Sequence, residues 1–251
     1  MRALLALAIV LAPGIAAAQP AWAKLSAPEV LAKVDATYAS AKGVSASFTQ
    51  TVVNTTFGTT TVSTGTVYVA RPDKMRWDYT TKKQSLDKSF IFDGTTLWVV
   101  EPANRQVLKH TVVSGTMPAA ISFLTGGGGL TKEFTAKAPS APNQHVPGAV
   151  VIELSPKQPT AQYTRLLLVI DPTAWTVARS IVTDANGASN TFEFAGVNLK
   201  AKHNASIFQF NPQRVPTYKV VTVAPPAASP TTSKKLPAPA PAKSPAPAPK
   251  N

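Results

Sequence analysis

The stretch that decides the fold is Gly65–Val107, which reads GTVYVARPDKMRWDY, then a short polar linker, then FIFDGTTLWVVEPANRQV. Apolar and polar side chains alternate in it with a period of two, which is typical of half-buried β-strands. Pro72 ends the first strand because proline has no amide hydrogen for a ladder. Asp93-Gly94 lies between two apolar runs and predicts a tight hairpin. The stretch therefore predicts an antiparallel sheet with one apolar face.

About a dozen strands are expected between residues 44 and 223, and Asn186-Gly187 predicts a second hairpin. So many strands make a flat open sheet curl or close, so the sequence predicts a curved, mainly β barrel with helices over its mouth. The expected strands are Ser45–Val53, Thr59–Ala70, Lys74–Thr80, Lys88–Phe92, Thr96–Glu101, Val107–Val112, Lys132–Ala136, Val150–Leu154, Gln162–Ile170, Val177–Thr183, Thr191–Val197 and Ile207–Phe210.

Two helices are expected. Ser26 and Glu29 have the spacing of a capping box, and the apolar residues that follow recur at helical spacing until Gly43. A shorter helix is expected over Pro118–Leu124, ending at the four glycines of Gly126–Gly129. The first helix needs a sheet to cover its apolar side, and the second has little polar surface.

The two ends of the chain do not belong to this domain. Residues 1–23 combine a basic start, a short apolar run and A-x-A sites at Ala18 and Ala23, which predicts a secretory signal peptide cleaved after one of them. Residues 224–251 are rich in proline, alanine and lysine, which predicts a disordered, extended tail. Residues 24–223 are therefore expected to form one domain, and the chain has no cysteine for disulfides or for lipid attachment.

Charge and motifs exclude several classes of protein. The formal net charge is +13, and residues 24–223 hold +8 of it, spread without a dense basic cluster, so no nucleic-acid partner is expected. We found no motif for a metal site, a cofactor or a nucleophile and expect none of these. The rival interpretation is an enzyme with paired carboxylates drawn from Glu153, Asp171, Asp184 and Glu193. Single acids at strand ends are normally solvated, so we expect no enzyme.

Arg71 stands out at the end of the first strand. It has the parity of Val67 and Val69, so its guanidinium is expected at the last rung of the apolar face. Because arginine is rarely buried, the alternative is an ordinary solvated or salt-bridged arginine.

The apolar face is the candidate ligand site. An apolar strand face more often forms ordinary core, which stays the alternative for each residue. For residues 90–92 and 97–99 both parities are apolar, so their faces stay unassigned. The cavity candidates are Phe48, Val67, Val69, Met75, Trp77, Tyr79, Ile121, Phe123, Leu124, Phe208 and Phe210.

A series of short motifs follows in order along almost the whole of this domain. Together they resemble the periplasmic outer-membrane lipoprotein carrier family, LolA. The motifs are F-T-Q at Phe48–Gln50, G-x-V-x-V-x-R-P at Gly65–Pro72, R-W-x-Y at Arg76–Tyr79, D-G-x-x-L-W at Asp93–Trp98, E-P-x-x-x-Q-V at Glu101–Val107, L-S-P-K at Leu154–Lys157 and F-x-F-x-P at Phe208–Pro212.

The resemblance implies an α+β, mainly β fold: an unclosed antiparallel β-barrel whose helical lid encloses an apolar cavity for acyl chains. It implies a monomeric periplasmic chaperone of a Gram-negative bacterium that carries acylated lipoproteins from an inner-membrane ABC transporter to an outer-membrane receptor. It also implies that Arg71, which matches the arginine of the R-P motif, bonds to lid backbone and acts as a latch. The alternative on the same fold is a periplasmic lipid carrier or a regulator that senses lipids or lipoproteins.

Overall fold

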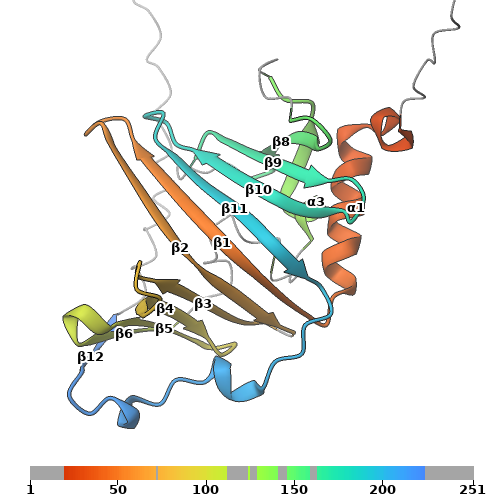
Figure 1. The fold of residues 1–251 in the computed structure, drawn as a ribbon. Helices are drawn as coiled ribbons and strands as arrows, with labels where there is room; N and C mark the ends of the chain where they lie inside the picture. Colours follow the sequence, from red (N-terminus) through yellow and green to blue (C-terminus); the bar gives the residue numbers. More distant parts are fainter. Residues whose placement is uncertain are drawn as a thin grey trace, which may run out of the picture.

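A computed structural model describes residues 20–71, 73–111, 124, 129–140, 146–158 and 163–223. Their strands join into a single twelve-stranded sheet (Figure 1). In chain order these strands are β1 Gly43–Asn54, β2 Thr59–Ala70, β3 Lys74–Thr80, β4 Leu86–Phe92, β5 Thr96–Glu101, β6 Gln106–Thr111, β7 Phe134–Lys137, β8 Val150–Pro156, β9 Arg165–Asp171, β10 Thr176–Thr183, β11 Ser189–Asn198 and β12 Lys219–Val223.

The sheet is strongly curved but not closed. Its order is β12-β6-β5-β4-β3-β2-β1-β11-β10-β9-β8-β7, so β12 and β7 are its two edges. Every neighbouring pair is antiparallel except β12 and β6, which run parallel. The predicted fold class, mainly β with an unclosed antiparallel sheet, is confirmed.

Both predicted hairpins are present. The carboxylate of Asp93 accepts hydrogen bonds from the amides of Thr95 and Thr96 at 2.9 and 2.8 Å, which fixes the turn between β4 and β5. Asp184 accepts in the same way from Asn186 and Ala188, at the turn between β10 and β11. In both turns an aspartate replaces a backbone acceptor, which is the usual reason for this residue type at a turn.

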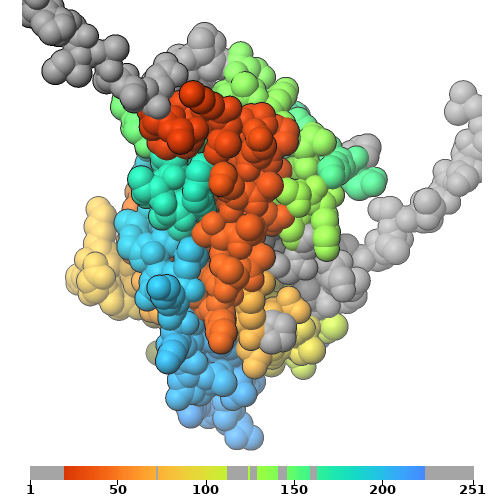
Figure 2. Space-filling view, turned by 90° about the vertical axis from the view of Figure 1, so that its right-hand side faces the viewer, coloured from red at the N-terminus to blue at the C-terminus, as the bar shows by residue number. Residues whose placement is uncertain are grey.

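The long helix α1, Ala27–Ser40, begins as the sequence predicts. Glu29 accepts from the amide of Ser26 at 2.7 Å and from its hydroxyl at 2.6 Å, which satisfies groups left open at a helix start. The helix packs against β7, β8 and β10, and Figure 2 shows it running down one side of the molecule. Tyr38 anchors it, because its hydroxyl accepts from the amide of Val177 on β10 at 3.1 Å. Burial raises the pKa of Tyr38 above its ordinary value.

Three assignments differ from the sequence prediction. The predicted strand Ile207–Phe210 is wrong: Ala205–Phe208 forms a 3-10 turn, started by the side chain of Asn204. The predicted strand Lys132–Ala136 begins as a short helix, α3 Leu130–Glu133, and only then becomes β7. Strand β12 was not predicted, because its five residues gain their ladder from β6, more than a hundred positions earlier.

The two faces of the sheet carry different cores. We call inner the face that carries Val67, Met75 and Trp77 and packs against α1, and outer the opposite one. On the outer face Ile91, Val100 and Val107 form a small separate cluster.

The segment after β11 runs across the outer face. Arg76 donates to the carbonyl of Ile207 at 3.1 Å, and the ring of Trp98 lies 5.3 Å from that of Phe210. Arg76 also pairs with Asp78 at 2.8 Å. This segment returns the chain to the sheet edge, where β12 begins (Figure 1).

Some predictions lie outside the described residues. These are the signal peptide up to residue 19, the tail from residue 224 and most of the helix expected at 118–124. Within the part of the chain that the structure describes, no helix is both long and apolar enough to cross a membrane.

Candidate ligand-binding face

An aromatic cluster occupies the middle of the inner face. Trp77 on β3 lies 4.8 Å from the ring of Phe48 on β1 and 5.3 Å from that of Phe192 on β11. Phe194 lies 6.3 Å from Trp77, and Tyr79 lies 5.0 Å from Phe48. Their mostly edge-to-face or tilted geometry is the favoured arrangement for aromatic pairs. The cluster joins strands that are distant in sequence.

Gly65 makes room for this cluster. A Cβ atom at Gly65 would lie 2.7 Å from the ring of Phe48 and 1.9 Å from the carbonyl oxygen of Asp78. The strand therefore needs glycine here so that a ring and a neighbouring backbone can approach closely.

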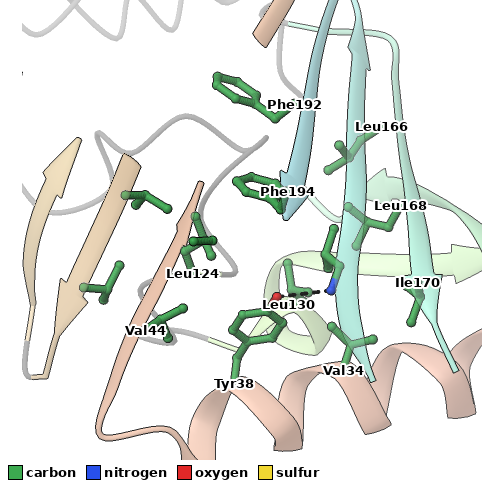
Figure 3. Close-up of a cluster of buried hydrophobic side chains, with 14 of the residues drawn as sticks. Val34, Tyr38, Val44, Leu124, Leu130, Leu166, Leu168, Ile170, Phe192 and Phe194 are labelled. Atoms are coloured by element: carbon green, nitrogen blue, oxygen red, sulfur yellow. Dashed lines mark hydrogen bonds between the residues drawn. The ribbon is translucent and has the colours of Figure 1, made fainter. Parts of the chain in front are cut away.

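Side chains from outside the sheet complete the buried part of the inner face. Val34 and Tyr38 reach it from α1, and Leu124 is 1% exposed beside them. Figure 3 shows Leu124 among side chains from β1 and β11, including Val44 and Phe194. The α1 half of the inner face is thus filled with protein.

The β4–β6 half of the inner face is less covered. The ladders pair Met75 with Phe92 and Trp77 with Phe90, and continue to Leu97 and Leu108 on β5 and β6. Of these residues, Phe90, Phe92, Leu97 and Leu108 are only half-buried. The unassigned parities are now resolved: residues 90, 92, 97 and 99 face inward, whereas residues 91 and 98 face outward. An apolar surface thus continues from the buried cluster to a half-exposed region.

A string of polar side chains crosses the apolar inner face. The hydroxyl of Tyr79 donates to Gln50 at 2.8 Å, and the amide nitrogen of Gln50 donates to Asn190 at 3.0 Å. Burial raises the pKa of Tyr79 to about 12, and the neighbouring Trp77 indole opposes that rise. Tyr79 is therefore neutral, and its proton is directed to Gln50.

Arg71 binds the C-terminal end of α1. Its Nε donates to the carbonyl of Ala41 at 2.7 Å, and its Nη2 donates to the carbonyl of Tyr38. These carbonyls lie at or just past the C-terminal end of the helix, where a cation is favourable; the Tyr38 carbonyl also accepts from the amide of Ala41 at 3.2 Å. The guanidinium thus joins the end of β2 to α1. Among the described residues, the side-chain acceptors of Arg71 are the carbonyls of Tyr38 and Ala41. The lid helix expected at 118–124 lies outside the described residues apart from Leu124.

Sequence reasoning missed Asp35. This residue on α1 accepts from the amides of Leu130 and Thr131 at 2.9 and 3.3 Å, and from the Thr131 hydroxyl at 2.7 Å. Gly129, with φ +75°, brings the chain so close that a Cβ atom there would lie 2.9 Å from the carboxylate. A lone acidic residue on a helix surface gave no signal, because its partner lies almost a hundred positions away.

Most described cavity candidates lie on the inner face. Phe48, Val67, Val69, Met75, Trp77 and Leu124 are buried there and Tyr79 is half-buried. The placement of Phe208 and Phe210 beside them is wrong. Phe208 packs on His203, which itself makes an edge-to-face contact with Tyr68 of the outer face, and Phe210 contacts Trp98 there. Ile121 and Phe123 lie outside the described residues.

The four acidic residues of the enzyme interpretation each bind close neighbours. Burial alone would raise the pKa of Glu153, but hydrogen bonds from Ser140 and the Lys137 ammonium at 3.1 Å lower it overall. The others are occupied in the same way: Asp171 by Thr173, Asp184 by its turn, and Glu193 by Arg179. None of these contacts, within the described part of the chain, joins two of the four acids. Nor do the described residues include a group of three or more His, Cys, Asp or Glu side chains that could hold a metal ion.

Comparison with known proteins gives a consistent picture. Residues 39–211 match the family model described as outer membrane lipoprotein carrier protein LolA. The chain is 30% identical over 213 residues to the outer-membrane lipoprotein carrier protein of Bordetella pertussis, covering 84% of this chain and 93% of the relative. The corresponding protein of Neisseria gonorrhoeae is 27% identical over 176 residues, covering 69% and 79%. The crystal structure of a LolA superfamily protein from Nitrosomonas europaea aligns with 74% of this chain and 98% of its own, with 10% identity and a TM-score of 0.41.

Proposed function

Because this chain belongs to the LolA family of outer membrane lipoprotein carrier proteins, we propose that it binds the acyl chains of lipoproteins and carries them through the periplasm to the outer membrane. The family consists of carriers, so a non-covalent task is expected of this member too. In this proposal the cargo arrives from an inner-membrane ABC transporter and leaves to an outer-membrane receptor. The carrier acts as a monomer without a cofactor.

The inner face is the observation that carries this proposal. It is apolar from the buried aromatic cluster to the half-exposed side chains of Phe90, Phe92, Leu97 and Leu108. A continuous apolar surface that is buried at one end and only half-buried at the other suits a flexible hydrocarbon chain better than a small polar substrate. Met75 adds an adaptable thioether to this surface.

The energetics of transfer explain why a carrier is needed. Each buried methylene is worth about 0.8 kcal/mol, so a lipoprotein with several acyl chains does not leave a membrane for water at a useful rate. A protein that covers those chains removes most of this cost. Binding must also be reversible, so some interaction has to favour the empty, closed form.

Arg71 is the proposed source of that preference. The guanidinium holds α1 against the end of β2 through two backbone carbonyls. We infer that acyl chains entering the inner face displace elements packed on it and weaken these bonds. When the Arg71 hydrogen bonds re-form, they stabilise the closed form and so favour release of the ligand. A ligand shifts a conformational equilibrium only through its different affinity for the two states.

The test is release of cargo from membranes. Spheroplasts that make a labelled triacylated lipoprotein are incubated with the mature protein, and soluble cargo is measured. We expect a soluble one-to-one complex. If no lipoprotein is released and free lipid copurifies instead, the protein is a lipid carrier or sensor on the same scaffold, and the proposal is wrong.

A further inference from the structure

One polar atom on the inner face lacks a partner. Among the side chains that the structure describes, the Trp77 Nε1 is the buried nitrogen or oxygen without a hydrogen bond. Trp77 is 2% exposed, so water does not replace the missing acceptor. Leaving a buried donor unpaired costs roughly 1–3 kcal/mol, and such a group in a native protein calls for an explanation.

No neighbour of Trp77 among the described residues offers an aligned acceptor. Rings of Phe48, Phe192 and Phe194 surround the indole and have no oxygen. The Tyr79 hydroxyl oxygen lies close enough to the indole N–H for that group to lower the tyrosine pKa, but the indole N–H is not aligned with it within hydrogen-bond geometry. Along the polar string each group donates away from Trp77, from Tyr79 to Gln50 and onward. The Tyr79 oxygen could still accept, but in this arrangement the indole N–H has no aligned acceptor.

Trp77 also lies where a ligand would arrive. In the β3–β4 ladder it pairs with the half-buried Phe90, at the boundary between the filled and the half-exposed parts of the inner face. An acyl chain is hydrocarbon except at its ester or amide carbonyl oxygen, which is an acceptor without a donor. The carbonyl oxygen could therefore supply the hydrogen-bond acceptor that the indole N–H does not have.

We propose that Trp77 Nε1–H donates a hydrogen bond to an acyl carbonyl oxygen of the bound ligand and so sets how deep the chains lie. This inference rests on the proposed function, since it needs an acylated ligand on the inner face. It deepens that function by making Trp77 a specificity residue: the protein selects acyl chains over alkyl chains of equal length.

The experiment compares two probes that differ only in the carbonyl groups. Dioctanoylglycerol and its dioctyl ether compete with a dansyl fatty acid for the purified full chain. A buried neutral hydrogen bond is worth about 1 kcal/mol, so we expect the wild type to bind the ester about three- to tenfold more tightly than the ether. Trp77→Phe should bind both probes with the same affinity, because it keeps an aromatic ring but has no donor.

The indole N–H resonance gives a second measurement, in which the ligand response is recorded on the wild type and the variant serves only for assignment. The chain has four tryptophans, so the wild type shows few indole N–H resonances, and that of Trp77 is assigned by its loss in Trp77→Phe. The ester should shift it downfield and the ether should not. Trp98→Phe, on the outer face, is the matched control and should keep the ester preference.

The outcomes separate the two ideas. If neither probe binds the wild type, the proposed function and this inference both fail. If both probes bind equally, or if Trp77→Phe keeps the ester preference, the inference is overturned and acyl binding stands. An unshifted Trp77 resonance with bound ester overturns it as well.

Discussion

The carboxylate of Asp35 accepts a 2.7 Å hydrogen bond from the hydroxyl of Thr131, although the two residues are 96 positions apart. Two backbone amides of the same segment point at this carboxylate. Asp35 thus fastens the start of α3 to α1, immediately after the run of glycines. Both helices contact β7, so this contact holds together two elements that cover the same half of the sheet.

Asp35→Ala should loosen that attachment. Hydrogen bonds to a charged group are worth about 1.5–3 kcal/mol, so we expect the free energy of unfolding to fall by about 2 kcal/mol. Hydrogen exchange should accelerate at the amides of Leu130 and Thr131 by tenfold or more, since these lose their acceptor. Asp87→Ala, at an exposed position, is the control. Unchanged exchange at Leu130 would show that the contact does not hold the segment.

Replacing Gly65 should disturb the aromatic cluster. A methyl group there overlaps the Phe48 ring and the Asp78 carbonyl, so Gly65→Ala should cost about 3 kcal/mol of stability. Urea unfolding followed by tryptophan fluorescence measures it. The neighbouring exposed Thr64→Ala should change stability by less than about 1 kcal/mol. Equal effects at both positions would contradict the close approach seen at Gly65.

Arg71→Leu should trap cargo. The variant cannot satisfy the α1 carbonyls, so the closed form loses roughly 1.5 kcal/mol and bound ligand is held about tenfold more tightly. Release from spheroplasts should persist while transfer to outer-membrane vesicles falls. Arg179→Leu, at an exposed arginine paired with Glu193, should transfer normally. Normal transfer by Arg71→Leu would rule out a latch.

Alkaline pH should lower the free energy of unfolding, because the half-buried Tyr79 ionises. Its pKa is raised to about 12, whereas an unfolded tyrosine ionises near pH 10. The stability that it contributes is therefore complete below about pH 10 and is lost as the pH rises from about 10 to about 12. The loss should amount to about 3 kcal/mol and should be absent in Tyr79→Phe, leaving the separate contribution of Tyr38. Unfolding curves across that range measure it, and identical curves for the two proteins would refute it.

Strands with local signals were predicted well. Thr59–Ala70, Lys74–Thr80 and Thr96–Glu101 have the bounds that the sequence predicts, because alternation and turn residues define them without help from distant partners. The capping box likewise placed the start of α1.

Features that depend on distant partners were not predictable. Strand β12 exists because β6 offers an edge, and Asp35 gained its role from a loop far along the chain. Phe208 and Phe210 alternate like strand residues, but the 3-10 turn places them on the outer face. Phe210 contacts Trp98 there. Parity places a side chain only where a strand is known to exist.

The position of β1 has a consequence for the order in which the chain folds. β1 lies in the middle of the sheet, between its sequence neighbour β2 and the distant β11. The β7–β11 half therefore cannot join the β2–β6 half until almost all of the domain is available. Such non-local pairing makes folding slow, because the chain between β1 and β11 loses conformational entropy before the contacts between these strands form. A chain threaded through a narrow channel from its amino end would stay unfolded until nearly all of it had emerged.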